Sequence, residues 1–73
     1  MQTTTMGKRI AGELRAEIAR QRRPQSDVCT AWGMSPGAVS ARLKGQRPLT
    51  IDQLFAACDL LGCDPLELMG RAA

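Results

Sequence analysis

The chain has 73 residues, 44% of them hydrophobic and 23% charged, which is the size and composition of one small folded domain. A domain this short buries only roughly 60% of its unfolded surface, so we expect a single domain over residues 1–73 without the deep cleft of an enzyme. The formal net charge of +3 is unevenly distributed: residues 1–23 carry +4, residues 24–48 carry +2 and residues 49–73 carry −3, which suits a protein that turns a basic face towards phosphate.

The first predicted helix spans about residues 5 to 21. Its apolar positions recur every four residues, the spacing of an amphipathic helix: Met6, Ile10, Leu14 and Ile18. Three arginines gather at its end: Arg20, Arg22 and Arg23. Positive charge there meets the negative end of the helix dipole, so helix stabilisation and contact with phosphate are both open roles for this cluster.

Two short helical patterns follow. Pro24 forbids simple continuation of the first helix, so a second helix is expected from about Gln25 to residue 31 or 32. Gly33 ends it, because glycine accepts the left-handed backbone conformation found just past many helices. Ser35 can accept a hydrogen bond from the free N–H groups of the next turn, and Pro36 has no N–H to leave unpaired, so a third helix begins there.

Large apolar side chains in this segment are spaced so that two helices at a steep angle share one small core: Val28, Trp32, Met34, Val39 and Leu43. Small and cationic residues fill most of the remaining positions, and we expect them to face outward. The spacing therefore predicts a helix-turn-helix.

A fourth helix is predicted after a G-Q-R-P loop. Thr50 and Gln53 form a T-x-x-Q capping box, and Leu49 and Leu54 stand where a hydrophobic staple places them. Its apolar positions follow helical spacing until Gly62 ends it: Ile51, Leu54, Phe55, Cys58, Leu60 and Leu61.

A short fifth helix is expected from Pro65 to about Met69. Asp64 stands as its cap, Pro65 takes the first position, and Glu67 is expected to reach back to the cap as in a capping box. No segment alternates apolar and polar residues for long enough to form a strand. We therefore expect an all-α fold of five short helices packed as one compact domain, with its core over about residues 6–69.

Residues 1–5 are polar and no apolar run approaches the roughly 20 residues that cross a bilayer, so we expect no leader peptide, no membrane insertion and a cytoplasmic location. The chain has no histidine, and its cysteines form no C-x-x-C pair, which argues against a zinc site. Cys29, Cys58 and Cys63 are expected to be small buried hydrophobes, with a disulfide or redox switch as the alternative. Because no nucleophile pair or glycine-rich phosphate loop is present, no enzyme activity and no cofactor are expected.

The order of these elements resembles that of the Cro and lambda-repressor-like helix-turn-helix family over roughly residues 6–69. Several features carry the likeness: Gln25 at the start of the second helix, the G-M-S turn at residues 33–35, the end of the third helix at residues 39–45, and D-P-L-E-L at residues 64–68. The run V-S-A-R-L-K-G-Q-R-P-L-T is similar to variants among actinobacterial phage and host regulators. Pro24 departs from the usual capping threonine or serine, and small residues occupy third-helix positions where relatives often carry Gln, Asn or Arg.

The resemblance implies that the third helix enters the major groove of double-stranded DNA while the second crosses above the phosphates. Five residues are expected to contact phosphate: Gln25, Ser35, Lys44, Arg47 and Arg23. Five are candidates for base contact: Gly37, Ala38, Ser40, Ala41 and Arg42. Plain structural roles stay open beside these: a solvated helix start for Gln25, a cap alone for Ser35, ordinary loop charges for Lys44 and Arg47, and a phosphate contact or none for Arg42.

The function implied is a sequence-specific transcriptional regulator, such as a Cro-like or immunity repressor of a phage or prophage, which covers a promoter and takes no small-molecule ligand. Tight operator binding usually needs a symmetric homodimer, and Leu66 and Met69 are the candidates for its interface. Two alternatives stand beside it. One is an antitoxin that binds both operator DNA and a protein toxin, and the other is a protein-interaction module that keeps the fold without binding DNA.

Overall fold

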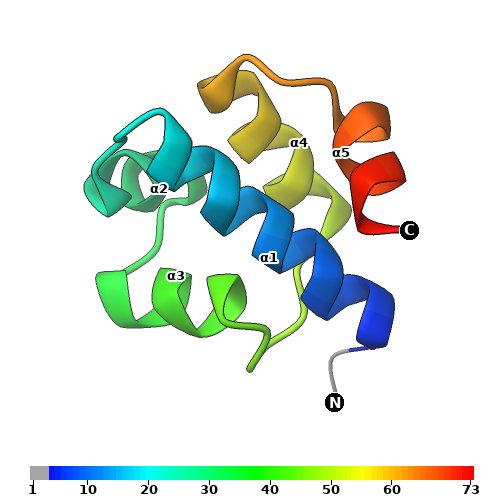
Figure 1. Ribbon diagram of the computed structural model, residues 1–73. Coiled ribbons are helices and arrows are strands. Elements are labelled where there is room, and N and C mark those ends of the chain that lie inside the picture. Colours follow the sequence, from blue (N-terminus) through cyan, green and yellow to red (C-terminus); the bar gives the residue numbers. More distant parts are fainter. Residues whose placement is uncertain (1–3) are drawn as a thin grey trace.

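The computed structural model describes residues 4–73, which form five helices and no strand (Figure 1). These helices are α1 (Thr5–Arg20), α2 (Gln25–Trp32), α3 (Pro36–Leu43), α4 (Ile51–Leu61) and α5 (Pro65–Ala72). The all-α prediction is confirmed for this part of the chain. The expectation of no leader peptide rests on the polar residues 1–5, and residues 1–3 of that segment lie outside the described residues.

The long helix α1 runs through the middle of the fold. It packs against α3 on one side and against α4 and α5 on the other, while α2 packs against α3 and α4. Figure 1 shows α3 along one edge, with α1 between it and α5. This arrangement leaves one side of α3 uncovered by other helices.

Four of the five helices end in the same way. A residue one or two positions past each of these helices adopts the left-handed conformation: Arg22, Gly33, Gly45 and Gly62. In each case the next N–H donates to the carbonyl oxygen five residues earlier, over 2.9 to 3.1 Å, as in a Schellman motif. Gly33 and Gly62 thus end the second and fourth helices as predicted.

Arg22 is the exception among these four residues, since it has a side chain and a φ of 54°. Left-handed backbone costs a residue with a Cβ atom roughly 1–2 kcal/mol, whereas glycine escapes that cost. The turn between α1 and α2 therefore carries local strain at Arg22.

The helix starts confirm most of the predicted caps. The Ser35 hydroxyl accepts from the N–H of Ala38 over 3.3 Å, and Thr50 and Gln53 form the reciprocal capping box with both bonds at 3.0 Å. Pro24 precedes α2 with no side-chain cap, as its ring requires. These local signals place the beginnings of α3 and α4.

The predicted start and end of α5 need two corrections. Asp64 accepts from the N–H of Leu66 over 2.9 Å, but Glu67 does not reach back to close a capping box. The helix also continues to Ala72 rather than ending near Met69. Its last turn is stabilised by packing on α1, because Ala72 is buried there and the Arg71 guanidinium lies 3.6 Å from the Glu17 carboxylate.

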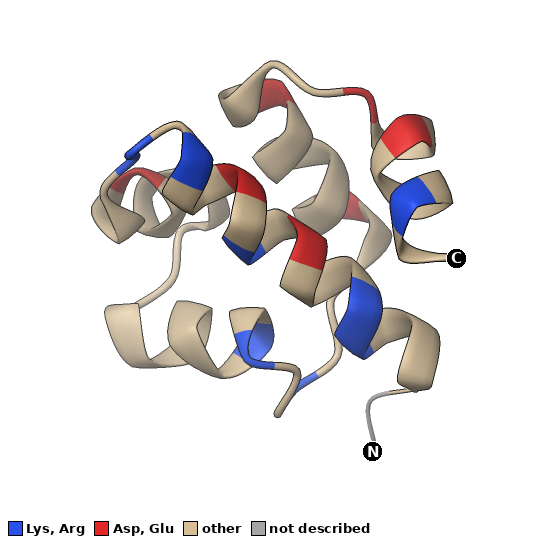
Figure 2. Ribbon diagram, in the orientation of Figure 1, with Lys and Arg blue, Asp and Glu red and all other residues tan. Residues whose placement is uncertain are grey.

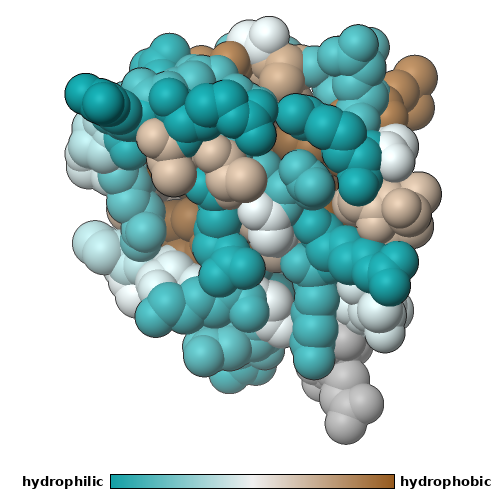
Figure 3. Space-filling model, viewed as in Figure 1, coloured by the Kyte–Doolittle hydropathy of each residue, from teal (hydrophilic) through white to brown (hydrophobic). Residues whose placement is uncertain are grey.

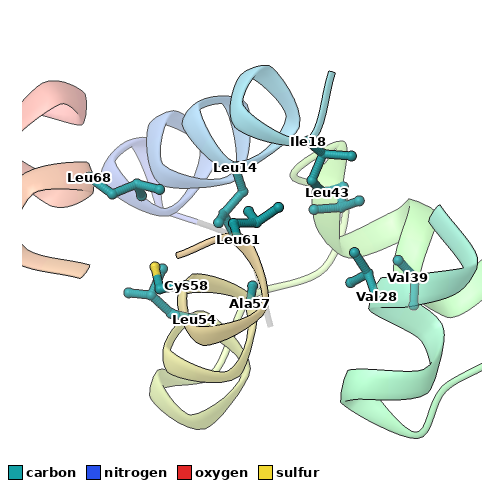
Figure 4. Packing of buried hydrophobic residues seen from close by; sticks show 10 residues of the cluster. All are labelled: Leu14, Ile18, Val28, Val39, Leu43, Leu54, Ala57, Cys58, Leu61 and Leu68. Carbon is teal, nitrogen blue, oxygen red and sulfur yellow. The ribbon is translucent and has the colours of Figure 1, made fainter. Parts of the chain in front are cut away.

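One hydrophobic core joins all five helices. Its buried members are Leu14, Ile18, Val28, Val39, Leu43, Leu54, Ala57, Cys58, Leu61 and Leu68. In Figure 4, Val28 of α2 faces Val39 of α3, and Ile18 of α1 lies beside Leu43 of α3. Trp32 and Met34 are half-buried at the margin, so the small core predicted for α2 and α3 is confirmed as part of a larger one.

Two apolar residues of α4 lie outside this core. Ile51 is 65% exposed and Phe55 is 49% exposed, whereas Leu54, Cys58 and Leu61 are buried. The buried three form one stripe of the helix, and Ile51 and Phe55 lie beside it at four-residue spacing. Ile51 and Phe55 thus follow the predicted helical spacing but do not pack into the core.

The turn between α2 and α3 is held against α4 by side-chain hydrogen bonds. The Trp32 indole N–H donates to the carbonyl oxygen of Gln53 over 2.9 Å, and the Gln53 amide lies 3.7 Å from the sulfur of Met34. These bonds fix the orientation of α2 relative to α4. Within residues 4–73, no helix has both the length and the apolar character needed to cross a membrane.

Candidate nucleic-acid interface

The starts of α2 and α3 are joined by a hydrogen bond. The side-chain amide of Gln25 donates from Nε2 to the carbonyl oxygen of Pro36 over 3.3 Å, across eleven positions of sequence. A three-residue turn, residues 33–35, connects the two helices. The free N–H groups of both helix starts therefore lie on neighbouring parts of the surface, where anions are favoured.

Gln25 and Ser35 both keep polar capacity for a ligand. The Gln25 amide carries two N–H groups, of which the bond to Pro36 uses one. The Ser35 hydroxyl accepts the bond from Ala38 and still has a proton to donate. Both residues are exposed, so each can contact a phosphate oxygen without giving up its structural bond.

The outward face of α3 is made of small side chains. Gly37 is exposed, and a Cβ atom built on it would meet no atom within 4 Å. Ala38, Ser40 and Ala41 are half-buried. This face can approach a flat or grooved partner closely, although it offers few hydrogen-bonding groups of its own.

Arg42 is folded back along its own helix. Its Nη1 donates to the carbonyl oxygen of Ala38 over 3.2 Å, while its Nε is buried and has no hydrogen-bond partner. An unpaired buried donor costs roughly 1–3 kcal/mol. The side chain therefore lies along α3, in a conformation that leaves one donor unsatisfied.

The loop after α3 carries two free cations. Lys44 and Arg47 are both exposed, and neither belongs to an ion pair within residues 4–73. Gly45 between them is buried, with a φ of 78°. It packs against Lys8 of α1, because a Cβ atom at Gly45 would lie 2.9 Å from Lys8 Cγ.

Lys8 is not among the contact residues that were predicted from the sequence. Nothing in the spacing of residues links position 8 to position 45, and the contact follows from the way α1 packs against α3 and the loop after it. The signal available in sequence was indirect: Gly45 ends α3, and the backbone of a glycine is open to close approach.

Charge is divided between two regions of the molecule. No acidic residue occurs between Asp27 and Asp52, a stretch that includes all of α3 and the loop after it. Figure 2 shows Lys and Arg at the end of α3, on this loop and on the first turns of α1, with Asp and Glu absent from α3. The ion pairs of the described residues lie elsewhere and involve Arg20, Arg23 and Arg71.

Arg23 differs from the other residues expected to contact phosphate. Its guanidinium donates to the carbonyl oxygen of Leu60 over 3.1 Å and to the Asp27 carboxylate over 3.4 Å. These bonds tie the turn before α2 to the end of α4. Contact with phosphate would have to be made by the donors that these bonds leave free.

The residues expected at a dimer interface lie on another part of the surface. Leu66 is 72% exposed, and Met69 is half-buried. Met69 lines a small apolar cavity of about 90 Å³, between α1, α4 and α5, to which Ile10 and Ile51 also contribute. Figure 3 shows that hydrophilic side chains dominate the face over α1, with separate small apolar areas.

An open polar hollow lies between the end of α1 and α5. Glu17 is at its base and accepts hydrogen bonds from Arg20 over 2.7 Å and from Gln21 over 3.0 Å. The Gln21 bond, with Arg20 and Arg71 nearby, lowers the pKa of Glu17 below 4.5, although burial opposes this. Of these partners only Arg71 belongs to α5, so its ion pair with Glu17 is the contact that links α5 to α1 here.

The cysteines are free thiols in this structure. Cys58 is buried in the core, and burial, followed by the neighbouring Cys63, raises its pKa to about 12. Cys29 and Cys63 are half-buried against the same core. The expectation of small buried hydrophobes is confirmed for Cys58 and in part for the other two.

Comparisons with known proteins give no further guide to this surface. No family model, curated protein or solved structure matches the chain.

Proposed function

We propose that this protein is a regulator that binds double-stranded DNA, of the Cro and lambda-repressor-like helix-turn-helix type, with α3 in the major groove. The observation that carries the proposal is the bond from Gln25 to Pro36, which joins the starts of α2 and α3, while α3 and the loop after it hold no acidic residue. Helices in this relationship can approach a duplex together, one over the phosphates and the other within the groove.

Phosphate contacts would hold the protein from two sides. At one side, Gln25 and Ser35 donate hydrogen bonds, assisted by the positive end of the α2 dipole. At the other side, Lys44 and Arg47 meet the backbone as unpaired exposed cations. Such contacts position α3 and make the affinity depend on salt, without reading sequence.

Base contact would come from the small face of α3. Gly37 allows the backbone to approach the groove, Ala38 and Ala41 can touch thymine methyl groups, and Ser40 can bond several bases. Arg42 could contact guanine only after its Nη1 leaves the Ala38 carbonyl. With few base contacts, the shape and deformability of the DNA supply much of the specificity.

Operator binding as a homodimer completes the proposal. Half-sites about 34 Å apart would face two copies of α3 in successive turns of the groove. Leu66 and Met69, which present apolar surface on α5, are the proposed interface residues. A repressor of this kind, from a phage or prophage, acts by covering a promoter.

The test is a titration of labelled duplex DNA with the protein at several salt concentrations. We expect Lys44→Ala and Arg47→Ala each to weaken binding to all sequences alike and to lower the salt slope by about 0.9. Arg42→Ala is expected to relax preference among sequences selected from a random pool. Arg9→Ala, which removes an exposed cation without an ion pair from α1, is the control.

Other outcomes favour the two alternatives. A flat binding curve without salt dependence would contradict DNA binding and favour a protein-interaction module. Specific co-purification with a small protein encoded beside this one, together with DNA binding, would favour an antitoxin.

A further inference from the structure

Lys8 of α1 and Gly45 after α3 form a close contact. A Cβ atom at Gly45 would lie 2.9 Å from Lys8 Cγ and 3.4 Å from Lys8 Cβ, so the aliphatic stem of Lys8 covers the glycine backbone. Lysine and arginine side chains commonly pack their aliphatic stems against the protein surface while the charged end reaches water. Lys8 is exposed overall, which agrees with a covered stem and a free ammonium group.

This contact brings a third cation to the loop after α3. Gly45 lies directly after Lys44 and two residues before Arg47. Lys8 forms no ion pair within residues 4–73, and neither do the two loop cations. Lys8 therefore lies, from a separate segment of the chain, against the loop that carries the other two unpaired cations.

The spacing of charges on α1 extends this edge. Arg15 follows Lys8 by seven residues, or about two helical turns, so both lie on nearly the same side of α1. Its Nη2 would lie 3.6 Å from a Cβ atom at Gly12, so the guanidinium is turned towards the N-terminal half of the helix, where Lys8 lies.

The acidic residues of α1 occupy a different side. Glu17 bonds Arg71 of α5, and Glu13 precedes Glu17 by four residues, which places it on the same side. Lys8 and Arg15 thus lie on the side of α1 that faces α3 and the loop after it, whereas the carboxylates lie on the side that faces α5. A polyanion that meets α3 and the loop would find no carboxylate on the adjacent edge of α1.

We propose that Lys8 contacts DNA phosphate together with Lys44 and Arg47, and that α1 is a third DNA-contacting element, with Arg15 beside Lys8. The inference rests on the proposed function, since it names a further positioning residue of the same surface. Gly45 then has two roles: it adopts the left-handed conformation that ends α3, and it gives the Lys8 stem room to lie over the loop.

The experiment measures the affinity of the full chain for a labelled mixed-sequence duplex between 50 and 200 mM salt. Lys8→Met keeps an aliphatic stem over Gly45 and removes the charge, while Lys8→Arg keeps the charge. Arg9→Met is the matched control, because it removes the same charge from the next position, which points away from the core. Thermal unfolding of each variant, followed by circular dichroism, checks that the fold is retained.

We expect Lys8→Met to lower the salt slope by about 0.9, so that its affinity falls about 3.5-fold less than that of the wild type over this range of salt. Lys8→Arg and Arg9→Met should keep the wild-type slope. A wild-type slope for Lys8→Met, or an equal loss in Arg9→Met, would overturn the inference while leaving the proposed function intact. If the wild type shows no salt-dependent binding, the proposed function fails and the inference fails with it.

Discussion

Gln25 Nε2 lies 3.3 Å from the carbonyl oxygen of Pro36, so the first residues of two successive helices are directly bonded. The bond holds the start of α3 beside the start of α2, and it leaves the second amide N–H of Gln25 free. One side chain is thus able to join the two helix starts and to hold a phosphate at the same time.

Replacement of Gln25 by alanine removes both the bond to Pro36 and the proposed phosphate contact, and two measurements distinguish the effects. Gln25→Ala loses an exposed hydrogen bond, so we expect its stability to fall by only about 0.5–1.5 kcal/mol. Its affinity for duplex DNA should fall about 10- to 150-fold, because a hydrogen bond to a charged group contributes roughly 1.5–3 kcal/mol. Denaturant unfolding and DNA titration measure the two effects. Thr30→Ala, near the other end of α2, is the control, and unchanged DNA affinity in Gln25→Ala would contradict the phosphate contact.

Arg22→Gly is expected to stabilise the protein. Glycine relieves the left-handed strain at this position, although it adds flexibility to the unfolded chain, so the net gain should be about 0.5–1 kcal/mol. No ion pair is lost, because Arg22 forms none within residues 4–73. In the reverse change, Gly62→Ala, the added Cβ atom meets no atom within 4 Å, so the strain of the left-handed backbone alone should lower the stability by about 1 kcal/mol. Thermal unfolding compares the two variants, and a less stable Arg22→Gly would show that the arginine side chain contributes more than the strain removes.

Glu17 is expected to make stability depend on pH below neutrality. Its pKa is lowered in the folded state by the bond from Gln21 and by the nearby Arg20 and Arg71. A lowered carboxyl pKa contributes stability that is complete above the unfolded value, near 4.5, and is lost as the pH falls through the folded value. Glu17→Gln should therefore be less stable than the wild type at pH 7.

Acidification then provides the check on this assignment. The difference in unfolding temperature between wild type and Glu17→Gln should shrink as the pH is lowered from 5 to 2. Glu67→Gln removes a carboxylate from an exposed position of α5 and should change stability little at pH 7. A wild-type advantage over Glu17→Gln that persists undiminished at pH 2 would mean that the charge of Glu17 is not its source.

The helix boundaries were predictable because the groups that set them are close in sequence. Ser35 bonds Ala38, Thr50 and Gln53 bond each other, and Gly33 needs only the preceding turn of α2. Each signal spans five residues or fewer. Helix α1 was predicted to end at about residue 21, but the left-handed conformation of Arg22 was not predicted, because no glycine marks it.

The contacts between helices could not be predicted in the same way. The bonds from Gln25 to Pro36 and from Trp32 to Gln53, and the contact of Lys8 with Gly45, join residues that are 11 to 37 positions apart. They depend on the angles at which the helices pack, which apolar periodicity does not specify. The loop cations and the helix starts of the candidate surface were therefore predictable from the sequence. The contribution of α1 was not, because it depends on how the helices pack.

Chemical-shift mapping tests most directly whether α3 and its flanks form the DNA surface. The ¹⁵N-labelled protein is titrated with a mixed-sequence duplex of about 20 base pairs, long enough for two successive turns of the groove. We expect the largest amide shifts at Gln25, along α3, at Lys44 and the loop after it, and at Lys8, with smaller changes on the exposed face of α5. Shifts confined to α5 and the exposed start of α4, or no shifts at all, would contradict DNA binding through α3.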